Sequence, residues 1–128
     1  MLNKDFFKIT EFIDNDDNIN QFAARIELNR EHDIFKGHFP GEPIVPGVCL
    51  LQMAKEIIEE RLKVKLQLIK APNVKYLSIV NPDVDPIIEY QFQVNRAEQQ
   101  VTVDVSAKNH EAVCIKMKAV FVERGYEL

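Results

Sequence analysis

The stretch DIFKGHFPGEPIVPGVCLLQMAKE, residues 33–56, changes within a few positions from a loop composition to a helix pattern. It holds three of the chain's four glycines and three of its six prolines, all of them before position 48. Proline fits the first turn of a helix because its missing N–H has no intrahelical partner there. Pro46 and Gly47 therefore predict the start of a long helix, which runs to about Lys63 and follows a loop centred on His38.

The expected helix has two faces of different character. At a helical period, its apolar face comprises Leu51, Ala54, Ile58 and Leu62. The opposite, polar face comprises Gln52, Lys55, Glu56, Glu59 and Lys63. We expect Glu56 to be a solvated glutamate beside two lysines, and the small Cys49 to be an apolar helix residue.

The segments before and after this helix alternate between apolar and polar residues, which is typical of half-buried strands. Alternation is clearest in residues 21–29, 88–94, 101–107 and 113–121, and residues 6–13 and 73–80 are further candidates. Short polar connections favour antiparallel hairpins over helical crossovers. The pattern predicts an α+β fold in which a curved antiparallel sheet of about six strands surrounds one long central helix.

Length and composition limit the possible classes of protein. A chain of 128 residues with 46% hydrophobic composition suffices for one compact domain, residues 1–128. A net charge of −4 argues against a nucleic-acid binder, and no apolar run is long enough for membrane insertion. Two cysteines without a CxxC motif, and no signal-peptide pattern, indicate a cytoplasmic protein. His32 and His110 lack ligands at metal spacing, so we expect no metal.

A histidine in a Gly/Pro loop just before a helix has two chemical assets. Its side chain takes a proton near neutral pH, and the N–H groups of the helix start can polarise a carbonyl oxygen. The alternative is that His38 fills a gap in a tight chain path. The density of glycine and proline exceeds what one turn requires, which favours a site for proton abstraction.

The segment FKGHFPGEPIVPGV, residues 35–48, resembles the active-site signature of the 3-hydroxyacyl-acyl carrier protein dehydratases, which have the hot-dog fold. The resemblance implies that His38 removes the α-proton of a 3-hydroxyacyl thioester. It also implies that the backbone N–H of Gly47 binds the thioester oxygen, and that the reaction needs no cofactor. The substrate-binding residues that it suggests are Phe39, Gly41 and Val48.

The chain departs from this family where the catalytic acid is expected, because Gln52 occupies the position of a Glu or Asp. A carboxamide orients a hydrogen bond but does not protonate a leaving hydroxide, and losing such a group costs about 10²–10⁴ in rate. Glu56, one helical turn further along, could substitute through a water, although a solvated glutamate is the better interpretation.

Three functions remain open. The first is a dehydratase of fatty-acid or polyene-chain synthesis, acting on a substrate linked to acyl carrier protein or coenzyme A. Family sites lie across a dimer interface, so the chain is expected to form a homo-oligomer, or a heterodimer with an acid-bearing paralogue. The others are a thioesterase and a catalytically silent acyl-binding subunit. Residues 61–75 carry five positive side chains and no negative one, either to dock an acidic carrier protein or as a solvated face.

Overall fold

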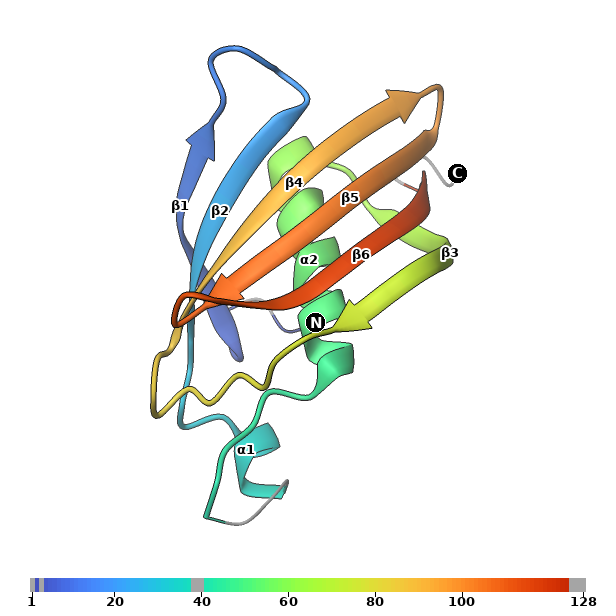
Figure 1. Cartoon of the computed structure of the whole chain (residues 1–128). Helices are drawn as coiled ribbons and strands as arrows, with labels where there is room; N and C mark the ends of the chain where they lie inside the picture. The colour runs from blue at the N-terminus through green and yellow to red at the C-terminus, as the bar shows by residue number, and fades with distance from the viewer. Residues whose placement is uncertain (1, 3, 38–40, 125–128) are drawn as a thin grey trace.

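The computed structural model describes residues 2, 4–37 and 41–124, which form one six-stranded antiparallel sheet and two helices (Figure 1). The elements in chain order are β1 Phe7–Asp14, β2 Gln21–Leu28, α1 Asp33–Gly37, α2 Gly47–Leu62, β3 Leu66–Tyr76, β4 Ile87–Ala97, β5 Gln100–Asn109 and β6 Ala112–Glu123. The strand order in the sheet is β1-β2-β4-β5-β6-β3, so β1 and β3 are its edges.

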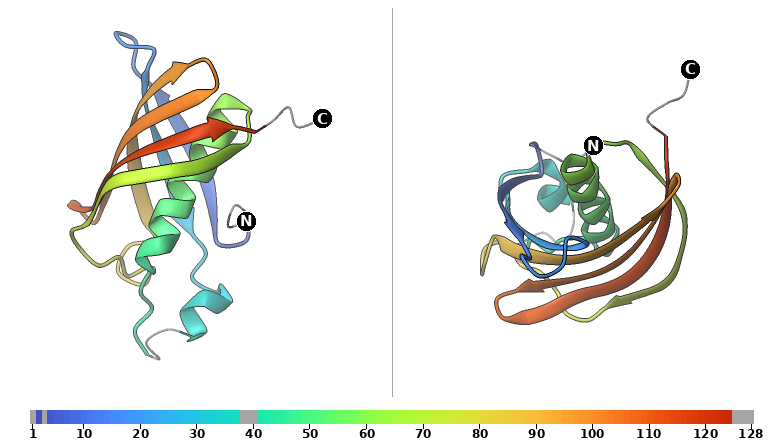
Figure 2. Two further views of the ribbon diagram at one scale, coloured as in Figure 1. Left: turned by 90° about the vertical axis from the view of Figure 1, so that its right-hand side faces the viewer. Right: turned by 90° about the horizontal axis from the view of Figure 1, so that it is seen from above.

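The sheet curls around α2, which lies along its concave side (Figure 2). Alternation along β2 places Phe22, Ala24, Ile26 and Leu28 in the core, as expected for a strand with one face on the core. The β4-β5-β6 meander is also confirmed, and its strands pair in sequence order. The predicted architecture of a curved sheet around one long helix is therefore correct.

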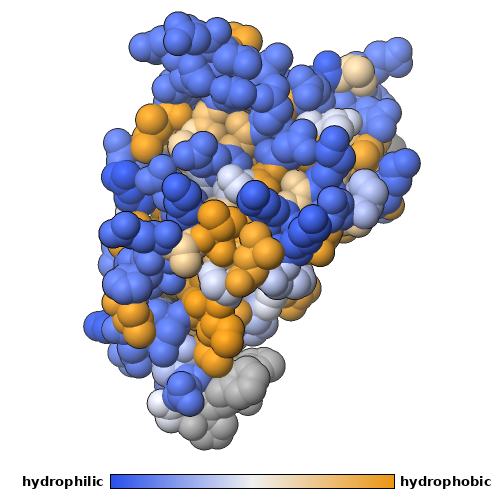
Figure 3. Space-filling view, viewed as in Figure 1, coloured by the Kyte–Doolittle hydropathy of each residue, from blue (hydrophilic) through white to orange (hydrophobic). Residues whose placement is uncertain are grey.

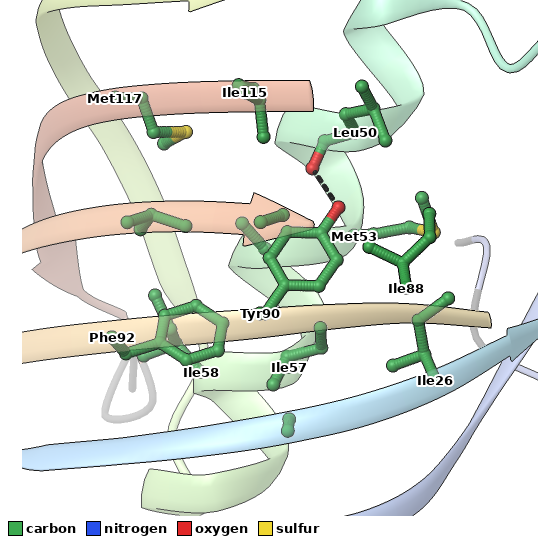
Figure 4. Packing of buried hydrophobic residues seen from close by; sticks show 14 of the residues in the cluster. Ile26, Leu50, Met53, Ile57, Ile58, Ile88, Tyr90, Phe92, Ile115 and Met117 are labelled. Carbon is green, nitrogen blue, oxygen red and sulfur yellow. Dashed lines mark hydrogen bonds between the residues drawn. The ribbon is translucent and has the colours of Figure 1, made fainter. Parts of the chain in front are cut away.

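The core lies between the concave face of the sheet and α2 (Figure 4). Met53, Ile57 and Ile58 of α2 are fully buried against residues of the sheet. Tyr90 of β4 is also fully buried, and its hydroxyl donates a hydrogen bond of 2.8 Å to the Leu50 carbonyl oxygen. This bond satisfies the polar tip of an otherwise apolar side chain and ties the sheet to the first turns of the helix.

The buried face of α2 is broader than the sequence predicts. Its buried residues are Cys49, Leu50, Met53, Ala54, Glu56, Ile57, Ile58 and Glu59. The expectation of a solvated Glu56 is wrong, because this side chain is only 2% exposed. The N-terminal segment and the start of β3 cover the polar face: the Leu2 backbone N–H donates to Glu56, and the Leu66 N–H donates to Glu59 at 2.8 Å.

The strand expected at residues 73–80 is displaced toward the N-terminus, since β3 ends at Tyr76. Residues 77–80 are outside the strand. Single backbone hydrogen bonds connect them to the rest of the fold, such as the one from the Leu77 N–H to the Cys114 carbonyl. Edge strand β3 is mostly exposed and its pairing with β6 shifts register twice. A strand that is mostly exposed imposes little alternation on the sequence.

The segment that leads into α2 is held at both ends. The short helix α1 was not predicted from the sequence. Its Phe35 is buried and stacks on Phe6 with ring centroids 5.3 Å apart. At the other end, the Val45 N–H donates to the Val80 carbonyl at 3.0 Å. In the part of the chain that the structure describes, no helix is long and apolar enough to cross a membrane.

Candidate active site

The N-terminus of α2 is the centre of the predicted site. The helix begins at Gly47, as expected, with Pro46 in the N-cap position and no side-chain hydrogen bond to cap it. The Cys49 N–H donates to the Pro46 carbonyl at 2.9 Å and so closes the first turn. An uncapped helix start carries partial positive charge on N–H groups that have no intrahelical acceptor. It is therefore suited to polarise a carbonyl oxygen.

Gly47 lies directly against the ring of Tyr76 at the end of β3. A Cβ atom at position 47 would stand 2.9 Å from both Cε1 and Cζ of that ring, closer than carbon atoms pack. A side chain at position 47 would therefore require the Tyr76 ring to shift. Tyr76 is half-exposed and its partner is twenty-nine residues earlier in the chain, so the sequence carried no signal for this contact. Beside it, the predicted substrate-binding residue Val48 is 70% exposed.

The loop before α2 supplies the other predicted residues. Gly41 is exposed and has φ of 90°, a left-handed conformation that residues with a side chain rarely adopt. The glycine is therefore required by the backbone, and its contact with substrate stays a prediction. His38 and Phe39 lie outside the described residues, so the catalytic and binding roles expected for them also stay predictions.

Gln52 is half-buried on α2, one turn beyond the helix start. Its Nε2 atom donates a hydrogen bond of 2.8 Å to Oε2 of Glu56. The same carboxylate accepts the backbone N–H of Leu2, at 2.9 Å to Oε2 and 3.1 Å to Oε1. The i,i+4 spacing of Gln52 and Glu56 could have indicated the contact between them. The covering segment that buries Glu56 has no such local signal.

One hollow of the chain lies away from the predicted site. A hollow of about 860 Å³ lies on the sheet over β2, β4, β5 and β6, and its lining includes Gln91 and Ser106. None of Gly41, Gly47 and Gln52 contributes to its walls.

The cysteine at the start of α2 and the two other histidines are poor candidates for catalytic residues. Cys49 is buried, as expected, and burial raises the pKa of its thiol, which lowers the fraction of reactive thiolate. His32 is half-buried, where a surface position was expected. Its Nδ1 accepts the Ile34 N–H at 3.0 Å and its ring packs edge-on against Phe6. His110 is exposed, and its Nδ1 lies 3.9 Å from Oδ2 of Asp85.

Two cations of the basic stretch at residues 61–75 are engaged in ion pairs within the chain. Arg61 is paired with Asp14, and its guanidinium lies over the rings of Phe12 and Phe22, with 5.1 Å to the Phe22 centroid. Lys63 is paired with Glu60 at 2.7 Å. The first two of the five cations are therefore engaged within the chain.

Comparisons with known proteins agree with this fold and point to one family. A model of the ApeI-like family, described as ApeI dehydratase, matches residues 14–118. The dehydratase heterocomplex ApeI:P from Xenorhabdus doucetiae superposes with a TM-score of 0.70 at 15% identity, over 89% of this chain and 96% of that chain. No curated protein sequence matches the chain.

Further solved structures share the hot-dog architecture. A hypothetical thioesterase with coenzyme A from Streptococcus pneumoniae TIGR4 has a TM-score of 0.65 at 12% identity, over 95% of this chain and 88% of its own. A sigma28-regulated virulence protein from Campylobacter jejuni has a TM-score of 0.69 at 11% identity, over 99% and 91%. At these identities the likeness shows the fold.

Proposed function

Because the chain belongs to the ApeI-like dehydratase family, we propose that it eliminates water from a 3-hydroxyacyl thioester during fatty-acid or polyene-chain synthesis. The family match over most of the chain is the observation that carries this proposal. The uncapped start of α2 at Gly47 supports it, because the reaction develops negative charge on the thioester oxygen. The substrate is linked to acyl carrier protein or to coenzyme A.

Two groups of this chain act when the α-proton is removed. His38 takes the α-proton, and the Gly47 N–H stabilises the enolate-like oxygen that forms as this proton leaves. Fixed donors of this kind contribute about 3 kcal/mol to transition-state stabilisation. The bond from C3 to its hydroxyl oxygen then breaks, and the departing hydroxide takes up a proton to leave as water.

The proton for the departing hydroxide comes from outside this chain. Gln52 is a carboxamide and has no proton to give at ordinary pH. We place the missing acid on a partner, so that His38 of this chain works with a carboxylic acid of a related hot-dog subunit. The ApeI:P structure from Xenorhabdus doucetiae is itself described as a dehydratase heterocomplex. A homo-oligomer of this chain would retain the base and lack the acid.

The edge strand β3 is the surface that we assign to the partner. As an edge, it presents unpaired backbone groups on the side away from β6. Apolar residues gather on this part of the surface, over β3 and the segment that follows it (Figure 3). The exposed large apolar side chains of this region are Leu68, Ile69, Tyr76, Leu77 and Ile79. Pairing of β3 would cover the apolar surface and add walls beside Gly47, which Tyr76 already contacts.

The function is tested by following enoyl-thioester formation from 3-hydroxyacyl thioesters of carrier protein and of coenzyme A. The chain is assayed alone and mixed with an acid-bearing hot-dog paralogue. His38→Ala should abolish turnover in the mixture. His110→Ala is the matched control, because its side chain is exposed. Turnover that survives His38→Ala would contradict the assignment of the base.

A catalytically silent acyl-binding subunit is the second candidate, and the carboxamide at position 52 favours it. In that case the chain binds acyl thioesters and stabilises its partner without taking part in the reaction. Mixtures in which His38→Ala retains full turnover, together with acyl-thioester binding by the chain, would establish this role.

A further inference from the structure

The buried carboxylate of Glu56 has a role that the proposed reaction leaves unassigned. It sits on α2 with 2% of its surface exposed, and its Oε2 lies 2.8 Å from Nε2 of Gln52. Gln52 stands at the position where the family carries its acid. Burying a carboxyl group is costly unless it is hydrogen-bonded. The hydrogen bonds of Glu56 therefore indicate its role.

These contacts determine which way the Gln52 side chain turns. Nε2 of Gln52 donates to Oε2 of Glu56, so the amide presents its NH₂ group, and not its oxygen, to Glu56. The amide group is planar, and its nitrogen and oxygen point in different directions from the carbon that they share. Oε1 of Gln52 and the second N–H are therefore directed away from Glu56 and remain available to a ligand.

We propose that Glu56 is a positioning residue that orients the Gln52 carboxamide to bind the 3-hydroxyl group of the substrate. This inference rests on the function proposed above. Oε1 of Gln52 accepts the hydroxyl proton in a hydrogen bond. No proton passes through Gln52 or Glu56, and neither residue changes its covalent state in the reaction.

Glu56 could instead serve only to anchor the N-terminal segment, because it also accepts the Leu2 backbone N–H. The chain contains a matched control for that role. Glu59 is a second buried glutamate of α2, and its Oε2 accepts the Leu66 backbone N–H at 2.8 Å. Glu59→Gln therefore perturbs an anchoring carboxylate of the same helix while leaving the contact with Gln52 intact.

The first measurement is independent of activity. The side-chain amide protons of Gln52 are observed by NMR in the ¹⁵N-labelled chain and assigned by their absence from Gln52→Ala. Glu56→Gln should shift these signals and speed their exchange with solvent, and Glu59→Gln should leave them unchanged. Glu56→Ala, which has no acceptor at all, provides a second variant. Gln52 signals that are the same in wild type and in both Glu56 variants would overturn the positioning role.

The second measurement asks what the oriented amide recognises. Binding of a 3-hydroxyacyl thioester is compared with binding of the same acyl thioester without the hydroxyl group. Wild type should bind the hydroxylated ligand more tightly, and Glu56→Gln should reduce this preference by about tenfold, as expected for one lost hydrogen bond. Glu59→Gln should keep the preference.

The outcomes separate the two proposals. Wild type that binds both thioesters equally would overturn hydroxyl recognition, while thioester binding would still support the proposed function. Wild type that binds neither ligand, alone or with the paralogue, would overturn the proposed function. The NMR comparison would in that case still decide whether Glu56 orients Gln52.

Discussion

The ring of Tyr76 lies against the backbone of Gly47, so that the end of the edge strand β3 and the start of α2 share one contact point. A Cβ at position 47 would come within 2.9 Å of two ring atoms. The contact joins the element that we assign to the partner with the N–H groups that we assign to the thioester oxygen. Assembly and catalysis would thus depend on neighbouring residues.

Gly47→Ala should destabilise the chain by about 1 kcal/mol, because the added methyl group forces the half-exposed Tyr76 ring to move. In a Tyr76→Ala background the same substitution should cost much less, since the clash is removed. Urea unfolding of the four variants of this double-mutant cycle measures the coupling. Equal costs of Gly47→Ala in both backgrounds would show that Tyr76 does not constrain this position.

Gln52→Glu should raise dehydratase turnover of the isolated chain, by about 10²-fold if the restored group acts as a general acid. The new carboxyl would stand within hydrogen-bond distance of Glu56, because Nε2 of Gln52 lies 2.8 Å from that carboxylate now. Two carboxyls so close share a proton, which raises one apparent pKa of the pair and keeps one carboxyl protonated nearer neutral pH.

Steady-state kinetics with 3-hydroxyacyl thioesters test this gain, which should appear in kcat more than in KM. Gln52→Glu combined with Glu56→Gln is the control, because it removes the second carboxyl and should move the pH optimum downward. A Gln52→Glu chain that stays inactive alone, but is active with the paralogue, would show that the acid must come from the other subunit.

Stability should fall at high pH because of Tyr90. Burial raises the pKa of its hydroxyl well above the ordinary value, so the folded chain keeps this proton after the unfolded chain has lost it. The contribution is complete below the unfolded pKa of about 10 and is lost as the pH rises above it, at up to about 1.4 kcal/mol per pH unit. Desolvation of the thiols of Cys114 and Cys49 acts with the same sign.

Tyr90→Phe should cost about 1 kcal/mol at neutral pH, since it deletes the hydrogen bond to the Leu50 carbonyl. It should also make the decline above pH ~10 shallower. Urea unfolding between neutral and alkaline pH measures both effects, with the half-exposed Tyr76→Phe as control. The prediction fails if both variants show the same alkaline slope as wild type.

Ile69→Lys should weaken oligomer formation, because it places a charge on the exposed edge strand β3, where Ile69 is 56% exposed. Ile19→Lys is the matched control: Ile19 is 94% exposed and lies between β1 and β2. Sedimentation at micromolar concentration should give smaller species for Ile69→Lys alone. Identical sedimentation of wild type and both variants would argue against pairing through β3.

The parts of the fold that were predictable are those with one buried face. The β2 strand and the β4-β5-β6 meander alternate because each second side chain enters the core. The start of α2 was marked by Pro46 and Gly47. Strand β3 was misplaced because an exposed edge with two register shifts imposes no such period on the sequence.

Local residues indicated the helix start at Gly47, whereas the long-range contacts around the candidate site had no local signal. Gln52 was recognised as the departure from the dehydratase signature, whereas the burial of Glu56 depends on Leu2, fifty-four positions away. The ring that lies against Gly47 likewise belongs to Tyr76, at the C-terminal end of β3. Single-sequence patterns report neighbours along the chain and the side that a side chain faces, but not which distant segment will cover it.

The pairing of β3 with β6 also sets an order on folding. Leu66 pairs with Glu123 and Tyr76 with Ile115, so β3 meets its only partner in the sheet when the last strand arrives. During synthesis α2 and β3 emerge well before β6, and loop closure over such separations is slow. Until then β3 presents two unpaired edges, and contact with a partner through one of them could trap the wrong arrangement. A chaperone that covers β3 until β6 has been synthesised should therefore increase the yield of native subunits.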